Sequence, residues 1–393
     1  MKSNYIVLKS TASPTRGPFG PGPRTEGVPA QAGVRVEIET LARPQLATLA
    51  NDASVIAVAP AMPMQLIRPV SREPVAGARA ALAWGIGAVG ADTSPRTGDG
   101  VVVAVLDTGI DASHPAFAGI ELVQQDFTGE GNGDRHGHGT HCAGTIFGRD
   151  VGGTRIGIAR GVRRALIGKV LGENGGGSSD QIVKAILWAV DEGAHVISMS
   201  LGMDFPGWVK GMIQQGVPED LATSRALEGY RANTRLFDAL SDLVNARGLT
   251  SRSTLIVAAA GNESRRELGE DFEISVAPPA IAEGIVSVAA LGESSAGLKV
   301  AQFSNTGANL SGPGVGVISA APGGGLVSMS GTSMATPHVA GVAALWAEQL
   351  LARGRLDAFT LIGKLAGNAS TEPLANGFDP FDVGAGLVRC PQE

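Results

Sequence analysis

The stretch that decides the fold is Gly331–Gly341, which reads GTSMATPHVAG. Pro337 fits the first turn of a helix, where a missing backbone N–H does no harm. The residues that follow are small and apolar, so we expect the helix to be buried on most sides. Ser333 would then lie at the positive end of this helix, where free backbone N–H groups can receive a developing oxyanion.

Two other segments offer partners for this serine. Val101–Leu106 is an unbroken apolar, β-branched run typical of a buried parallel strand, and Asp107 follows it directly. That position matters because open α/β sheets form their sites at the carboxyl ends of strands. His138 lies in a histidine-rich turn that leads into a small-residue helix. A serine hydroxyl needs an adjacent base to become a nucleophile, so the three residues predict an acid–histidine–serine set.

These residues lie in blocks that resemble the signature blocks of the subtilisin-like serine peptidases. The three blocks are VLDTGI at 105–110, HGTHCAG at 138–144 and GTSMATPH at 331–338. AAAGN at 258–262 resembles the block that carries the side-chain donor of the oxyanion hole, and SMSLG at 198–202 resembles the strand that pairs with substrate. Five blocks in the family's order are far more specific than any one of them.

The resemblance implies a serine endopeptidase that forms an acyl-enzyme on Ser333 and acts on protein or peptide substrates. Asp107 would orient His138, His138 would act as the base, and Asn262 would complete the oxyanion hole. The substrate-binding walls would comprise Ser200, Leu201, Gly202, Ala259, Ala260 and Gly261. Their small residues favour an apolar side chain before the scissile bond, with Glu263 near the rim able to attract a basic one. The alternative is a catalytically silent relative that binds peptides and retains its N-terminal domain.

The resemblance also implies a three-layer α/β sandwich with a mainly parallel central sheet at residues 73–393, and a small α+β prodomain with its linker at 1–72. The prodomain's last segment, 62–67, would lie in the chain's own active-site groove, and self-cleavage is expected in a linker at 68–74. Residues 11–33 are rich in Pro and Gly where the family's first prodomain helix would fall. A helical insertion is expected at about 203–253, with helices over 218–230 and 234–247. It could form a wall or lid over the groove, or a surface hairpin.

Other polar residues compete for these roles. His136, His138 and His141 could form a metal cluster, but the HExxH arrangement is absent. Asp111 and Asp126 could replace Asp107, but neither directly follows a buried strand. The chemistry requires no cofactor. The resemblance leaves structural calcium open at loop 149–155 together with Asp126, but that loop offers few side-chain oxygens, so no metal site is assigned.

Charge, hydropathy and cysteine content exclude several other classes of protein. A net charge of −6 provides no electrostatic footprint for nucleic acid or an anionic membrane. No run approaches the roughly 18 apolar residues that span a bilayer. Two cysteines, Cys142 and Cys390, cannot form a disulfide framework, and Cys142 is expected to be a small core residue. Met1–Asn4 leads directly into a predicted strand without a signal segment, so the chain as written is expected in the cytoplasm, and would be secreted if an upstream signal is missing.

Overall fold

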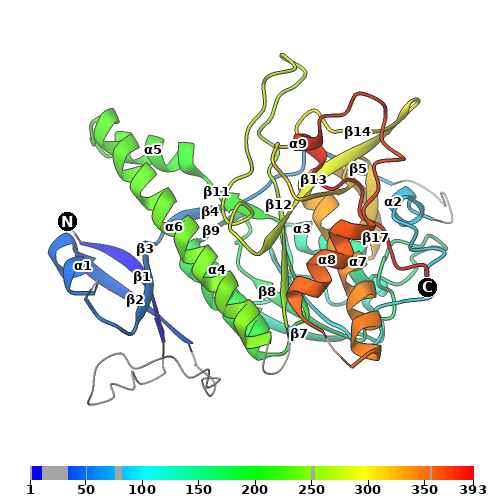
Figure 1. Ribbon diagram of the computed structural model, residues 1–393, viewed down its shortest axis with the longest axis horizontal. Coiled ribbons are helices and arrows are strands. Elements are labelled where there is room, and N and C mark those ends of the chain that lie inside the picture. The colour runs from blue at the N-terminus through cyan, green and yellow to red at the C-terminus, as the bar shows by residue number, and fades with distance from the viewer. Residues whose placement is uncertain (1, 11–33, 50, 76–81, 249–252, 355) are drawn as a thin grey trace, which may run out of the picture.

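The computed structural model describes residues 2–10, 34–49, 51–75, 82–248, 253–354 and 356–393. Figure 1 shows a layered body with a small sheet from the N-terminal region beside it. The strands are β1 Lys2–Ser10, β2 Val34–Ala42, β3 Val55–Pro60, β4 Pro63–Leu66, β5 Ser71–Pro74, β6 Val102–Asp107, β7 Glu121–Asp126, β8 Arg164–Lys169, β9 Gly176–Ser178, β10 Val196–Met199, β11 Leu201–Met203, β12 Leu255–Ala259, β13 Ile285–Ser294, β14 Gly297–Val300, β15 Leu310–Pro313, β16 Val317–Ala321 and β17 Gly325–Ser330. The helices are α1 Arg43–Leu49, α2 Trp84–Ala88, α3 His138–Phe147, α4 Ser179–Asp191, α5 Phe205–Gln214, α6 Glu219–Gly248, α7 Thr332–Ala352, α8 Ala358–Asn368 and α9 Pro380–Val383, with a 3₁₀ turn at Pro115–Phe117.

The central sheet has the strand order β14-β13-β12-β10-β6-β8-β7, with β15 also paired to β13. Its pairings are parallel except for β14, which runs antiparallel to β13. Such a sheet needs helices on both faces, because its strands are apolar on both sides. The mainly parallel α/β architecture is therefore as predicted.

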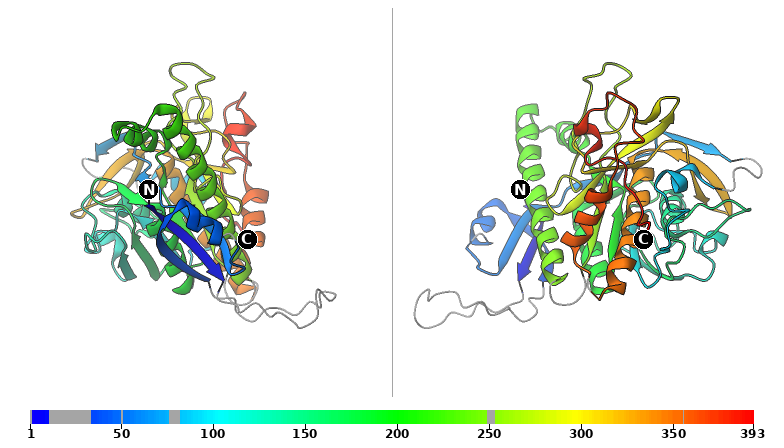
Figure 2. Two further views of the ribbon diagram at one scale, coloured as in Figure 1. Left: turned by 90° about the vertical axis from the view of Figure 1, so that its left-hand side faces the viewer. Right: turned by 45° about the vertical axis from the view of Figure 1, so that its right-hand side comes forward.

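Alternation along the strands separates two apolar layers. In β6, Val103 and Val105 pack with α3 and α7, whereas Ala104 and Leu106 pack with α4 and α6. Figure 2 shows helices on either side of the sheet. The two buried faces hold the carboxyl ends of β6, β10 and β12 in one rigid edge, which is where the predicted site residues meet. Within the described residues, no helix is long and apolar enough to cross a membrane.

Helix α7 begins earlier than its proline suggested. The helix starts at Thr332, so Pro337 lies inside it rather than in its first turn. A proline there cannot donate to the carbonyl four residues before it, which belongs to Ser333. That carbonyl is instead approached by the Cys142 thiol and the Ser200 hydroxyl, each at 3.4 Å. The proline thus leaves a carbonyl free to tie α7 to two neighbouring segments.

The N-terminal region forms two parts. Strands β1, β2 and β3 make an antiparallel sheet in the order β2-β1-β3, and Ile6, Leu8 and Ala59 on it are fully buried in the apolar layer that contains α4 and α6. We call these three strands the N-terminal sheet. The stretch 11–33, predicted from its Pro and Gly content to lack the family's first prodomain helix, lies outside the described residues.

Residues Met62–Pro74, which we call the groove segment, continue from this sheet across the body. β4 lies between β11 and β9, antiparallel to both, and β5 pairs antiparallel with β17. The expected linker at 68–74 is therefore wrong for its second half, because Ser71–Pro74 completes a three-stranded sheet. Within the groove segment, β4 is thus hydrogen-bonded on both sides, whereas β5 is an edge strand paired with β17 alone.

The insertion also differs from its prediction. One helix, α6, spans Glu219–Gly248 where two were expected, and α5 precedes it. No proline or glycine interrupts residues 231–233, and Asn233 donates to the carbonyl of Gly229 at 3.0 Å without breaking the helix. Asp204 caps α5 by accepting from Gly207 N. Since α6 lies between the N-terminal sheet and the body, the insertion is not an isolated surface hairpin (Figure 1).

Candidate active site

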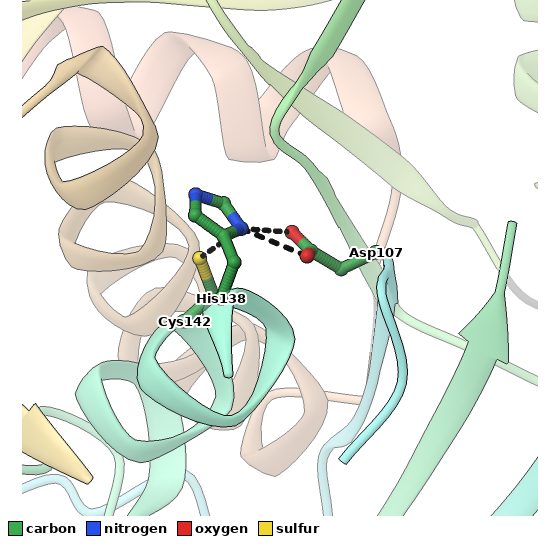
Figure 3. A group of neighbouring side chains, drawn as sticks. All are labelled: Asp107, His138 and Cys142. Carbon is green, nitrogen blue, oxygen red and sulfur yellow. Dashed lines mark hydrogen bonds and ion pairs between the residues drawn. The ribbon is translucent and has the colours of Figure 1, made fainter. Parts of the chain in front are cut away.

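The predicted acid and base lie in contact at the edge of the central sheet. Asp107 is the last residue of β6, and His138 is the first residue of α3. His138 Nδ1 lies 2.8 Å from Asp107 Oδ1 and 3.0 Å from Oδ2. Figure 3 shows the imidazole between Asp107 and the Cys142 sulfur, with its second nitrogen pointing away from both. The acid can therefore hold one ring nitrogen while the other remains free for chemistry.

A missing side chain makes this contact possible. A Cβ on Gly139 would lie 2.2 Å from the carbonyl oxygen of Gly109 and 3.2 Å from the Cβ of Asp107. Any larger residue would push the start of α3 away from the loop that follows β6. The Gly after His138 in the sequence block thus has a steric reason.

Burial and charge oppose each other at His138, which has no exposed surface. Burial alone lowers the pKa of His138, but the adjacent Asp107 carboxylate outweighs it and holds the pKa well above the ordinary histidine value. Burial raises the pKa of the Cys142 thiol, so this sulfur stays protonated beside the ring. The Asp107–His138 pair is therefore arranged to stabilise a protonated His138 ring.

Ser333 lies in the first turn of α7 and is fully buried. Its hydroxyl donates to the carbonyl of Ile67 in the groove segment at 2.8 Å. His138 Nε2 is buried and has no hydrogen-bond partner among the described residues. The expected hydrogen bond from serine to histidine is thus not made, because the groove segment supplies a competing acceptor.

Asn262 lies beside the start of α7. Its Oδ1 accepts from Thr332 N at 2.8 Å and from Thr332 Oγ1 at 2.9 Å, which fixes the amide orientation. Its Nδ2 donates to the carbonyl of Arg68 at 2.9 Å. The predicted oxyanion donor therefore holds a peptide carbonyl, but one residue beyond the carbonyl that Ser333 contacts.

The predicted substrate walls face the groove segment. Ile67 N donates to Ser200 O at 3.3 Å, and β11 pairs Leu201 with Leu66 and Gly202 with Gln65. A Cβ on Gly202 would lie 3.6 Å from the side chain of Ile67, which is buried. This wall therefore contacts an apolar side chain.

The second wall, Ala259, Ala260 and Gly261, continues from the end of β12 toward Asn262. Gly261 N donates to Thr332 Oγ1 at 3.2 Å, which joins this wall to α7. Glu263 Oε2 accepts from Asn305 Nδ2 at 2.7 Å. The carboxylate expected to attract a basic substrate is thus already engaged by an amide.

Sequence reasoning missed two residues that position the site. Asp134 Oδ1 accepts from Thr108 Oγ1 and Gly137 N, and Oδ2 accepts from Thr140, so Asp134 ties the acid's loop to the histidine's helix. Asn305 Oδ1 accepts from Glu263 N and Ser264 N and braces the loop that presents Asn262. Thr108 lies 26 residues from Asp134, and Glu263 and Ser264 lie 42 and 41 residues from Asn305, so no spacing signal revealed these links.

His141 and His338 each bond a main-chain carbonyl and are structural. His141 Nε2 bonds Val317 O at 3.0 Å, and burial lowers the pKa of His141 to about 3. His338 Nδ1 bonds Met334 O at 2.8 Å, and burial lowers the pKa of His338 to about 4. Over the described residues, the ligand-type atoms that gather within 4.8 Å of one another belong to Asp107, His138 and Cys142, without His136 or His141. The histidine-rich turn is not a three-histidine cluster.

The two segments considered for calcium do not fit that ion. Both carboxylate oxygens of Asp126 accept from its own turn, through Thr128, Gly129 and Gly131. In the loop at 149–155, the guanidinium of Arg149 donates to the carbonyls of Phe147 and Val162. A calcium ion in this loop would have to displace the Arg149 guanidinium from these carbonyls. Ca²⁺ requires six to eight oxygen ligands.

The two competing carboxylates have their own partners. Asp111 accepts from Ser113 and from Gly323 N, and Asp126 is engaged by its turn as described. Asp107 is the carboxylate that bonds His138. The catalytic role of Asp107 stays a prediction, and the observed contact is between His138 and the carboxylate that follows the buried strand.

Comparison with known proteins agrees with this geometry. Residues 98–354 match the model of the subtilase family. The chain is 34% identical over 256 residues to an intracellular serine protease of Paenibacillus polymyxa, covering 63% of this chain and 67% of that protein. It is 36% identical over 271 residues to Subtilisin Savinase of Lederbergia lenta, covering 67% of this chain and 82% of that protein. M-protease of Shouchella clausii (strain KSM-K16) is 37% identical over 271 residues, and the match covers 67% of this chain and 58% of that protein. The family model spans well over half of the chain, so the chain belongs to the subtilase family of serine proteases.

Proposed function

We propose that the chain is an endopeptidase that forms an acyl-enzyme on Ser333 and that its N-terminal region occupies its own groove until it is cleaved. The observation that carries this proposal is the course of the groove segment. It passes Ser333 between strands β4 and β5, with its carbonyls contacted by Ser333 Oγ and Asn262 Nδ2. Upstream of Ser333, β4 pairs through its main chain with β9 on one side and β11 on the other. Main-chain hydrogen bonds of this kind bind an extended peptide whatever its side chains are.

The chemistry follows from the side chains present. Once the Ile67 carbonyl leaves the serine hydroxyl, His138 Nε2 is free to take the proton from Ser333 Oγ. The oxygen then bonds to the substrate carbonyl carbon, and the peptide C–N bond breaks as the protonated imidazole returns the proton to the leaving amine. Water, activated by the same imidazole, hydrolyses the ester and restores Ser333. No cofactor takes part in these steps.

Asp107 and Asn262 have distinct roles in this scheme. The Asp107 carboxylate holds Nδ1 and stabilises the imidazolium, consistent with the raised pKa of His138. Asn262 Nδ2 and the backbone N–H of Ser333 would receive the oxyanion. The hydrogen bonds from Thr332 to Asn262 Oδ1 direct the amide nitrogen toward the groove before substrate arrives.

The uncut groove segment is held out of register for attack. Ser333 contacts the Ile67 carbonyl oxygen, while the donor that should receive that oxygen holds Arg68 O. Attack at Ile67 requires its carbonyl to turn from the serine to Asn262. We therefore expect slow self-cleavage at the Ile67–Arg68 bond, at the start of the region expected from sequence, and inhibition until it occurs.

The groove segment also indicates a substrate preference. Ile67 is buried against Gly202, with an apolar side chain in the position before the proposed scissile bond. Glu263 is engaged by Asn305, so a basic residue there gains little. We propose protein or peptide substrates with a medium-sized apolar residue in this position.

A silent peptide-binding module that retains its N-terminal region is not favoured. Such a module has no need for a buried Asp107–His138 pair, because an unused buried ion pair costs desolvation free energy without aiding peptide binding.

The test is hydrolysis of an internally quenched peptide by the purified full-length chain, compared with Ser333→Ala. The exposed Ser294→Ala is the matched control for a serine outside the site. We expect turnover in the wild type and in Ser294→Ala and none in Ser333→Ala. Equal turnover in all three proteins would contradict the proposal.

A further inference from the structure

The groove segment extends further upstream than its pairing with β11 requires. In β4, Met64 and Leu66 are buried while Pro63 and Gln65 are exposed, and Met62 continues this alternation as a fully buried side chain. Counted back from the proposed scissile bond after Ile67, Met62 is the sixth residue.

The main chain at Met62 is fixed by the body of the protein. Met62 N donates to Ser179 Oγ at 3.0 Å, and Ser179 N donates to Met62 O at 2.9 Å. These two bonds continue the ladder in which Pro63 opposes Ser178 in β9. Because they involve backbone atoms of Met62, any peptide that lies in the groove as this segment does can make them.

The side chain of Met62 reaches the insertion. A Cβ on Gly229 of α6 would lie 3.4 Å from Met62 Sδ, and 2.5 Å and 2.6 Å from two ring carbons of Trp208 on α5. The Met62 sulfur and the Trp208 ring therefore both lie against Gly229. Contact between a thioether and an aromatic ring is favourable, and an unbranched side chain fits a narrow space beside a ring.

The two helices are built to hold this point. Ala222, Ala226 and Gly229 are buried on one face of α6. A side chain at Gly229 would collide with Trp208, so its absence lets α5 approach closely. Phe205 of α5 packs edge-on against Tyr230 of α6, with ring centroids 6.0 Å apart. These contacts position Trp208, which packs against the apolar layer that contains Met62.

We propose that Trp208, Gly229 and Ser179 form a substrate subsite for the sixth residue before the scissile bond, which takes an unbranched apolar side chain. The insertion is then a specificity element, neither a lid over the nucleophile nor a surface hairpin. This inference rests on the proposed peptidase function.

The first test uses the full-length chain after self-processing, with active sites counted by titration with a fluorophosphonate. Two internally quenched peptides carry the sequence of residues 62–70 and differ only in Met or Asp at the first position. We expect kcat/KM to be about tenfold higher for Met, mainly through KM, as burial of one apolar side chain implies. A third peptide that begins at the fourth residue before the bond reports the peptidase activity by itself.

Trp208→Ala should reduce the Met-to-Asp ratio to about twofold or less, and Ile213→Ala, at a position 39% exposed on the same helix, should keep it. A wild type that cleaves the short peptide yet treats Met and Asp alike would overturn the subsite and leave the peptidase proposal standing. Failure to cleave any of the three peptides would contradict the peptidase proposal itself.

A second test does not need catalysis. In the Ser333→Ala chain, hydrogen–deuterium exchange at the amides of residues 62–67 should accelerate about tenfold on Trp208→Ala and remain unchanged on Ile213→Ala. Unchanged exchange in Trp208→Ala would show that the insertion does not hold the segment, and would overturn the inference.

Discussion

The N-terminal sheet and the groove segment belong to one stretch of chain but are held in different ways. The sheet is attached by buried side chains, with Ile6, Leu8 and Ala59 in the apolar layer formed with α4 and α6. The groove segment is attached mainly by main-chain hydrogen bonds to β9, β11 and β17. The sheet requires a particular surface, whereas most of the segment imitates a peptide that could have many sequences.

This difference separates the docking of the N-terminal region from the cleavage of the groove segment. The sheet can keep the N-terminal region docked without touching Ser333, His138 or Asp107. The segment brings carbonyls to Ser333 and Asn262, but in a register that does not match attack. Substitutions at the active site should therefore alter cleavage of the groove segment and leave the N-terminal sheet docked. Substitutions in the N-terminal sheet should weaken its docking and leave the cleavage chemistry unchanged.

The largest expected effect is that of Ser333→Ala on the groove segment. We expect the wild-type chain to acquire a new N-terminus at Arg68, while the variant keeps its full mass with the sheet still docked. In subtilisin, loss of the nucleophile reduces kcat by about 10⁶-fold, and we expect a similar loss here. Intact-mass measurement over time checks this. Cleavage of the Ile67–Arg68 bond in Ser333→Ala would show that cleavage of the groove segment does not depend on Ser333.

Asp107→Asn should reduce kcat by about 10⁴-fold, because an amide selects the wrong imidazole tautomer. It also removes the charge that raises the pKa of His138. The active base is the neutral imidazole, so wild-type kcat/KM should rise with pH through a pKa above the ordinary histidine range. In the variant this limb should move to lower pH, because burial then dominates. Coinciding pH profiles would argue against the Asp107–His138 link.

Asn262→Ala should cost about 10²–10³ in kcat, a magnitude taken from subtilisin, with little change in KM. It also removes the hydrogen bond to Arg68 O, so it tests the segment's register. Steady-state kinetics on a short peptide separate kcat from KM. A rise in KM with kcat unchanged would mean that Asn262 only binds the ground state.

Ile6→Ala tests the sheet by itself and should have the smallest effect on chemistry. Truncating a buried isoleucine typically costs about 2–5 kcal/mol, so the opening free energy of β1 amides should fall by that order in the Ser333→Ala chain. Ile56→Ala, at a position 42% exposed, is the control. Hydrogen exchange measures both. If Ile6→Ala releases the groove segment as completely as the sheet, the two regions are one unit.

The sequence could predict elements whose pattern is local. The apolar run Val101–Leu106 predicted a buried strand, and β6 spans Val102–Asp107, with Asp107 as its last residue. The order of the blocks also placed Asp107 and His138 together. Both follow from rules that act within a few residues or from the ends of parallel strands.

What could not be predicted depends on partners distant in the chain. Nothing near Ser71 indicates that it will pair with Ser330, and nothing near Asn305 indicates that it will brace the Asn262 loop. Pro337 misled because helix α7 tolerates it: the Ser333 carbonyl that it leaves free finds Cys142 and Ser200. The groove segment's register depends on all of these contacts at once.

The most direct measurement of the central claim is covalent labelling of the self-processed chain with a fluorophosphonate, followed by peptide mapping. An alcohol oxygen activated by a buried imidazole should take up one label, on the peptide that contains Ser333, and Ser333→Ala should take up none. Labelling elsewhere, or no labelling in chains that have lost their N-terminal region, would contradict the account.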